Sequence, residues 1–127
     1  MALTSVAGCL HSLHRPAEAL PKYEEALVIF GHTLPAGHQW LSITELGKGN
    51  SLLTLERYEE ARQTLVAVWG AIGDRVDVPK RLKVRSLQAL VKLFDALDAA
   101  EPDNMYAEDS ARYRALYATF STHAPSP

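Results

Sequence analysis

The chain has 127 residues, 47% of them hydrophobic, and a formal charge of −2 at pH 7. That length holds one domain with an ordinary core, and the hydrophobic fraction is too high for a disordered chain. The charge offers no basic surplus for nucleic acid or an anionic membrane, and no apolar run is long enough to cross a bilayer. The single cysteine, Cys9, cannot form an internal disulfide, which fits a reducing, cytoplasmic setting.

A self-similar pattern organises the chain, with one constant shift that carries Ala19 to Ala61. We call this shift the repeat spacing. The segments 15–19 and 57–61 both begin with arginine and end with glutamate followed by alanine. The repeat spacing also aligns apolar and small positions in three units: Leu10, Leu52 and Phe94; Leu13, Leu55 and Leu97; Ala7, Gly49 and Val91. A fixed period of this length is the signature of a repeat architecture.

The first unit reads as two helices. Apolar residues recur every three or four positions in the first of them, from Leu3 to Leu13, which predicts one buried stripe. A break at His14 and Arg15 follows, and Pro16 suits the first position of a second helix. That helix presents an apolar face, and the stretch 31–38, rich in glycine and proline, is a predicted loop.

The later units repeat this plan. Helices are predicted over about 39–55 and 58–72, followed by a loop over 73–79, and then over about 80–97 and 105–120. No strand-like alternation competes, so the predicted fold is all-α. We expect a single domain over 1–123 with units of about 1–38, 39–79 and 80–120, and a frayed tail over 124–127.

The small residues at helix crossings and the Arg-aromatic-Glu-Glu-Ala turn at 57–61 resemble the tetratricopeptide repeat (TPR). This resemblance implies a right-handed α-solenoid of about three helix-turn-helix units that binds a peptide or partner protein and catalyses nothing. An ordinary repeat of the family is shorter, at about 34 residues. The longer unit of this chain looks like the variant of kinesin light chains and many bacterial proteins. Such repeats often form the C-terminal tail of bacterial eukaryotic-like serine/threonine kinases, which makes a regulatory or substrate-recruiting tail the alternative function.

The resemblance also implies a concave groove lined by the first helix of each unit. Carried over one residue at a time, the predicted groove residues are Thr4, His11, Leu46, Asn50, Leu53, Arg85, Gln88 and Lys92. Their mixture of apolar and cationic side chains would suit a peptide with an apolar anchor and an acidic group.

Other chemistry finds little support in the sequence. His11 and His14 are three apart on a predicted helix, but a metal site needs three or four converging ligands, so a small metal-binding protein is a weak third alternative. No nucleophile, base and orienting group converge, and no cofactor motif is present. The first predicted helix begins at Met1 without a capping sequence, so we expect either that the array is a fragment of something longer or that its apolar face pairs with another copy or a partner.

Overall fold

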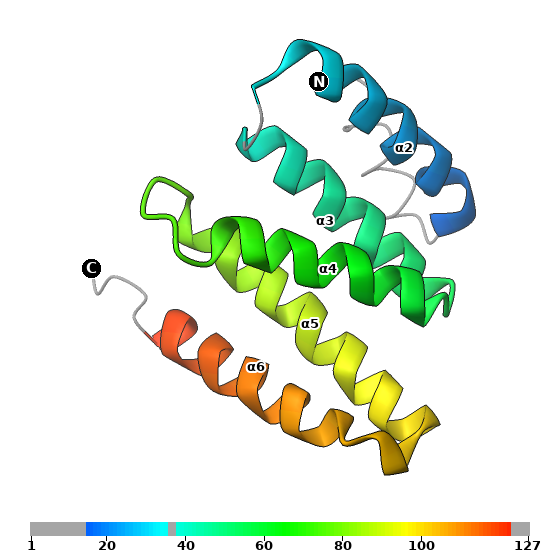
Figure 1. Cartoon of the computed structure of the whole chain (residues 1–127), viewed down its shortest axis with the longest axis vertical. Helices are drawn as coiled ribbons and strands as arrows, with labels where there is room; N and C mark the ends of the chain where they lie inside the picture. The colour runs from blue at the N-terminus through cyan, green and yellow to red at the C-terminus, as the bar shows by residue number, and fades with distance from the viewer. Residues whose placement is uncertain (1–14, 36–37, 123–127) are drawn as a thin grey trace.

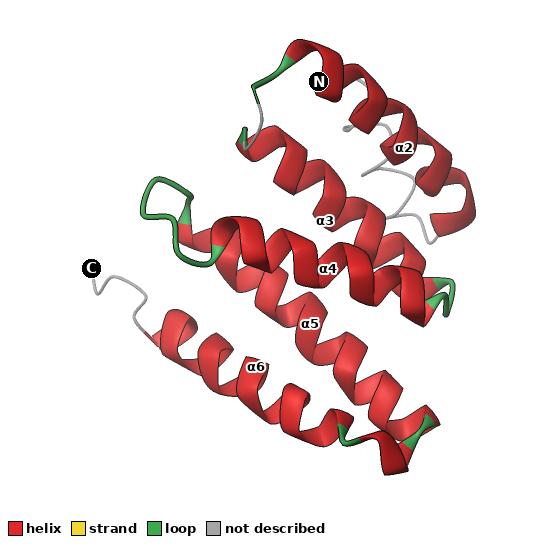
Figure 2. Ribbon diagram, in the orientation of Figure 1, coloured by secondary structure: helices red, strands yellow, loops and turns green. Residues whose placement is uncertain are grey.

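The structure, a computed structural model, describes residues 15–35 and 38–122. Its helices are α2 (Pro16–Thr33), α3 (Gln39–Thr54), α4 (Tyr58–Ile72), α5 (Lys80–Ala100) and α6 (Tyr106–Thr122), with a short 3-10 turn, η1 (Pro102–Asn104), before α6. The described residues include no strand (Figure 2), which confirms the all-α prediction. The first predicted helix and the tail over 124–127 lie outside the described ranges.

The helices form a stack in chain order. Each described helix packs against the next one, and α3 also contacts α5. Figure 1 shows α2 to α6 following one another down the long axis, with α4 in front of α3 and α5. Contacts limited to near neighbours are what a helical repeat requires, because each unit buries its apolar face on the adjoining one.

Prolines and a loop define α2. The helix begins at Pro16, as predicted, and Pro21 lies inside it with its side chain on the exposed side. A proline there removes one backbone donor, and water can satisfy the carbonyl that loses its partner. The predicted loop starts too early, because Gly31 and His32 continue the helix to Thr33. A Cβ added at Gly31 would have no neighbouring atom within 4 Å, so no close packing contact interrupts the helix at this glycine.

A Schellman motif ends α3. The backbone N–H of Arg57 donates to the carbonyl oxygen of Leu52 at 2.9 Å, and that of Glu56 donates to Leu53 at 3.0 Å. Glu56 adopts a positive φ of 62°, the left-handed conformation that this motif needs. The motif satisfies carbonyls at the end of α3 and turns the chain directly into α4.

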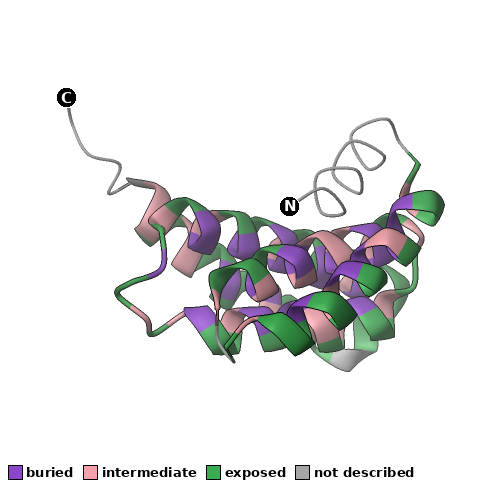
Figure 3. Ribbon diagram, turned by 90° about the horizontal axis from the view of Figure 1, so that it is seen from above, coloured by how far each residue is buried: buried purple, intermediate pink, exposed green. Residues whose placement is uncertain are grey.

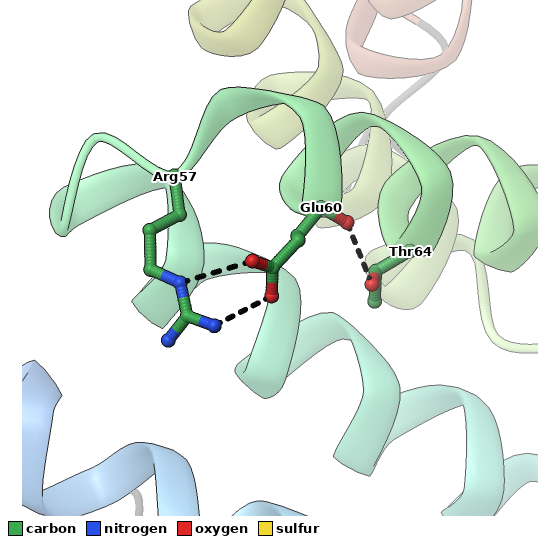
Figure 4. A network of polar contacts seen from close by, with 3 residues as sticks. All are labelled: Arg57, Glu60 and Thr64. Carbon is green, nitrogen blue, oxygen red and sulfur yellow. Dashed lines mark hydrogen bonds and ion pairs between the residues drawn. The ribbon is translucent and has the colours of Figure 1, made fainter.

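The repeat spacing reappears in the contacts at the start of α2 and α4. The Arg57 guanidinium donates to the Glu60 carboxylate at 3.3 and 2.7 Å, and Thr64 Oγ1 donates to the Glu60 carbonyl oxygen at 2.9 Å (Figure 4). The equivalent pair in α2, Arg15 with Glu18, has the same separation in sequence and a distance of 2.8 Å. Both pairs are about half exposed and add little stability, but they mark two equivalent helix starts.

Small residues let neighbouring helices approach closely. Ala19 and Ala61 are fully buried at the equivalent position of α2 and α4. A Cβ added at Gly49 would lie 2.5 Å from Leu65 Cδ2 of α4, and one at Gly47 would lie 2.4 Å from the Tyr23 ring of α2. Helix α3 is therefore closely packed against α2 at Gly47 and against α4 at Gly49, and glycine is the residue that fits both crossings.

The core follows from this two-sided packing. Buried side chains of α3, α4 and α5 form one cluster that α6 joins through Tyr113. Buried stretches alternate with exposed ones along each helix (Figure 3), as helices that bury part of their circumference require. Trp69 packs on this cluster and meets Phe120 of α6 edge to face, with ring centroids 6.0 Å apart. The aromatic pair therefore joins α6 to the second unit as well as to α5.

Candidate functional site

The predicted groove residues fall into three groups. Thr4 and His11 lie outside the described ranges. Leu46 is only 3% exposed and belongs to the core, which corrects its prediction as a groove residue, while Asn50 and Leu53 are half-buried on α3. Arg85, Gln88 and Lys92 are all exposed on one side of α5, at spacings of three and four positions. The candidate site therefore centres on α5.

Two hollows meet along this side of α5. The larger, of about 530 Å³, is lined by Lys80, Arg81, Val84, Arg85 and Gln88 of α5 and by Phe120 and Ser121 of α6. The smaller, of about 240 Å³, is lined by Gln88, Val91, Lys92, Arg114 and Tyr117. Gln88 borders both hollows, and we call the two hollows together the α5–α6 groove.

The α5–α6 groove is strongly cationic in a chain whose net charge is negative. Five of its lining residues carry a positive charge: Lys80, Arg81, Arg85, Lys92 and Arg114. Arg114 pairs with Asp95 at 2.7 Å, whereas the other four form no ion pair with a carboxylate of the described residues. The segment 80–92 contains no acidic residue at all. Four unneutralised cations therefore border the groove.

Three of these cations, Lys80, Arg81 and Arg85, lie where they do not favour the helix. Lys80 and Arg81 are in the first turn of α5, which has no acidic residue, although the positive end of the helix dipole favours acidic side chains there. Each such placement costs about 0.3–1 kcal/mol, and the like-charged pair Arg81 and Arg85 at i,i+4 adds a few tenths. Helix stability therefore does not account for this charge pattern.

Polar contacts hold α6 against α5 beside the groove. Gln88 Nε2 donates to the Tyr117 hydroxyl at 3.1 Å between the two hollows. The Asp95 carboxylate accepts hydrogen bonds from Ser110 Oγ and from the Arg114 guanidinium. These contacts span the two helices, so the width of the groove is set by side chains of its own lining and border.

Phe120, which lines the larger hollow, is held by two further contacts. Lys83 is only 9% exposed, and its ammonium lies 5.6 Å from the centre of the Phe120 ring. Phe120 in turn contacts Trp69 of α4. Lys83 is thus buried against Phe120, whereas Lys80, Arg81 and Arg85 line the hollow.

Two titratable groups of α2 and α3 report on the electrostatics nearby. Burial raises the pKa of Tyr23, and the positive charge of Arg85 opposes that rise, so the field of Arg85 reaches α2. Burial also raises the pKa of Glu45, with the charge of Lys48 opposing it. The two side chains lie one helical turn apart, so the lysine charge acts on the carboxylate from the same helix.

A further finding concerns the histidines. His38 falls at the end of the predicted loop, and its Nδ1 accepts a hydrogen bond from the Trp40 backbone N–H at 3.1 Å, which caps α3. Its ring also meets the Trp40 ring at 5.2 Å. His11 and His14, the pair behind the metal alternative, lie outside the described residues. Among the residues described, no three His, Cys, Asp or Glu side chains gather into a group that could hold a metal.

Three residues of the groove, Arg85, Gln88 and Lys92, were predicted from the sequence, and the others were not. Arg81 and Val84 could have been found, because the acid-free run over 80–92 is visible in the sequence. Arg114, Tyr117 and Phe120 come from α6, whose register departs from the repeat spacing, so no equivalent position indicated them. The groove thus extends outside the helix face that the family resemblance implies.

Known proteins add no further constraint. Comparison with them finds no matching family model, no similar curated protein and no similar solved structure. The described helices include none that is both long enough and apolar enough to span a bilayer. The feature that bears on function is therefore the α5–α6 groove, which is cationic and partly apolar.

Proposed function

We propose that the chain is a non-catalytic protein-interaction module, a right-handed solenoid of TPR-like helix pairs that binds a peptide or partner protein in the cytoplasm. The observation that supports it best is the α5–α6 groove, lined by four cations that form no ion pair with a described carboxylate, three of which do not favour the helix they belong to. The matched starts of α2 and α4 and the close crossings at Gly47 and Gly49 support the repeat architecture.

The helix stack explains why such a module can be small. Each helix buries its apolar face on its neighbour in the chain, so the exposed sides are free to vary in chemistry without loss of the core. The exposed side of α5 combines arginine, lysine and glutamine with two half-buried valines. That composition gives a partner both an apolar area to cover and charges to pair with.

The test is capture of partners by the immobilised full chain from a lysate of the source cells, read by mass spectrometry. We expect the double variant Asn50→Ala with Lys92→Ala to lose captured proteins that wild type retains. Lys22→Ala serves as the control, because Lys22 lies on α2 away from the groove and its side chain is 45% exposed. Identical capture by wild type and the double variant would contradict the proposal, as would the absence of any protein retained above the matrix alone.

A further inference from the structure

Part of the α5–α6 groove corresponds, in the repeat, to residues of α3 that are buried in the preceding unit. Three residues of α5 that line the hollows, Val84, Gln88 and Val91, each follow a residue of α3 by the repeat spacing. Those residues of α3 are Ser42, Leu46 and Gly49, and all three are buried. The same helix face is therefore covered in α3 and lines open hollows in α5.

Two helices that follow α3 in the chain lie against it: α4, whose Leu65 and Thr64 face Gly49, and α5. Helix α5 packs on α4 and also contacts α3, so it lies along the pair α3–α4. The pair α5–α6 presents the equivalent surface one unit later, and the described residues place no further helix on it. A helix is thus the shape that this type of surface accommodates in the structure.

The chemistry of the surface nevertheless changes between the two units. Gln39, Ile43 and Asn50 of α3 are neutral, whereas their equivalents one repeat spacing later are Arg81, Arg85 and Lys92. Leu46, which is buried, is replaced by Gln88, which is exposed. Gln39 and Ile43 are exposed and Asn50 is half-buried, so their cationic equivalents would lie beside a docked helix and not beneath it. A neutral helix would offer these cations no partner. An acidic helix would pair with them.

We propose that the α5–α6 groove binds an acidic amphipathic helix of a partner protein, in the position that the next helix of the stack would take. The inference depends on the proposed interaction function and specifies its partner. At the rise of an α-helix, the stretch of α5 from Lys80 to Lys92 is about 18 Å long. A partner helix of about three to four turns matches that length.

The groove assigns a role to each part of this partner. Its apolar stripe covers Val84, Val91 and Phe120, which border the hollows. Its carboxylates meet Lys80, Arg81 and Arg85 at one end and Lys92 at the other. Charge-assisted bonds of this kind also steer association, so the binding weakens as salt is added.

Three synthetic peptides, each about four helical turns long, test the proposal. The first has leucines at i, i+3, i+4 and i+7 with glutamates on the flanks; the second has lysine in place of each glutamate; the third repeats the first with a central proline. Each is titrated into the ¹⁵N-labelled full chain, so that even weak binding is seen and located by shifts of α5 and α6 amides. We expect the acidic peptide to bind, the basic peptide not to, and proline to weaken binding at least fivefold.

Charge-reversal variants connect the binding to the groove. Arg85→Glu with Lys92→Glu should weaken the acidic peptide at least tenfold, while Lys22→Glu should leave it unchanged; circular dichroism checks that each variant is folded. No binding of the acidic peptide, binding that is indifferent to the double variant, or equal binding of the proline peptide would each overturn the acidic-helix proposal. If a short nucleic-acid single strand bound as tightly, the groove would be a general polyanion surface, which would also overturn it.

A second copy of the chain is the remaining occupant to exclude. In sedimentation over a range of concentrations, we expect no self-association of the wild-type chain that depends on the groove. Self-association that Arg85→Glu with Lys92→Glu abolishes would overturn the partner-helix assignment. If the peptides fail but capture from lysate is still lost in Asn50→Ala with Lys92→Ala, the interaction module stands and only the acidic-helix assignment falls. If capture fails as well, the proposed function falls with it.

Discussion

Two glycine-to-alanine substitutions test the close helix crossing and differ only in what surrounds the new methyl group. Gly49 and Gly70 both lie inside helices, where alanine is favoured over glycine by about 0.5–1 kcal/mol. At Gly70 nothing lies within 4 Å of the added Cβ, so we expect Gly70→Ala to stabilise the fold by about that amount. At Gly49 the Cβ would lie 2.5 Å from Leu65 Cδ2 and 2.7 Å from Leu65 Cγ.

Leu65 cannot move aside easily, because it is only 1% exposed and packed in the core. Overpacking of this kind costs about 1–3 kcal/mol, which exceeds the gain in helix propensity. We therefore expect Gly49→Ala to destabilise by up to about 2 kcal/mol, and the two variants to differ by about 1–3 kcal/mol. Urea unfolding followed by far-ultraviolet circular dichroism measures both. If Gly49→Ala stabilises as much as Gly70→Ala, α3 and α4 do not cross at this glycine.

Three other substitutions follow from particular contacts. Ser86 Oγ is buried and has no hydrogen-bond partner among the described residues, so Ser86→Ala should leave the melting temperature unchanged or raise it, and a clear fall would reveal a missed partner. Glu56→Gly should stabilise by about 1 kcal/mol in urea unfolding, because Glu56 holds a positive φ that glycine adopts freely; destabilisation would contradict this conformation. Because burial raises the pKa of Glu45, the folded state binds its proton more tightly, and stability falls as pH rises from the ordinary carboxyl value of 4.5 through the folded pKa. Glu45→Gln should remove this loss, so the variant should be more stable than wild type at pH 7 and equally stable at low pH. An equal difference in stability at both pH values would refute the prediction.

Local signals in the sequence located most of the described helices. Pro16 and the repeated arginine turn predict the starts of α2 and α4, and the apolar spacing predicts α5. The exception is the end of α2, where Gly31 suggested a loop. This glycine is part of the helix, and its Cα faces open space. Glycine lowers helix propensity by about 1 kcal/mol, which tertiary packing readily overrides.

The site was harder to predict, for two physical reasons. Helix α3 is buried on two sides, so the position of Leu46 on the implied groove face does not decide whether it is exposed. The groove also depends on α6, which follows η1 and a left-handed residue, Met105, with a φ of 61°. That connection shifts the register of α6 against the repeat, so Tyr117 has no equivalent residue to indicate its place beside Gln88.

The central claim is that helix pairs stack through small residues at a fixed spacing, and NMR tests it most directly. In the methyl-labelled, ¹⁵N-labelled full chain, we expect nuclear Overhauser contacts between Gly49 and the Leu65 methyl groups and between Gly47 and the Tyr23 ring. We expect the ring contact between Phe94 and Tyr113, whose centroids are 5.4 Å apart, in the same spectra. Assigned spectra that lack both glycine contacts would contradict the stack and the groove built on it.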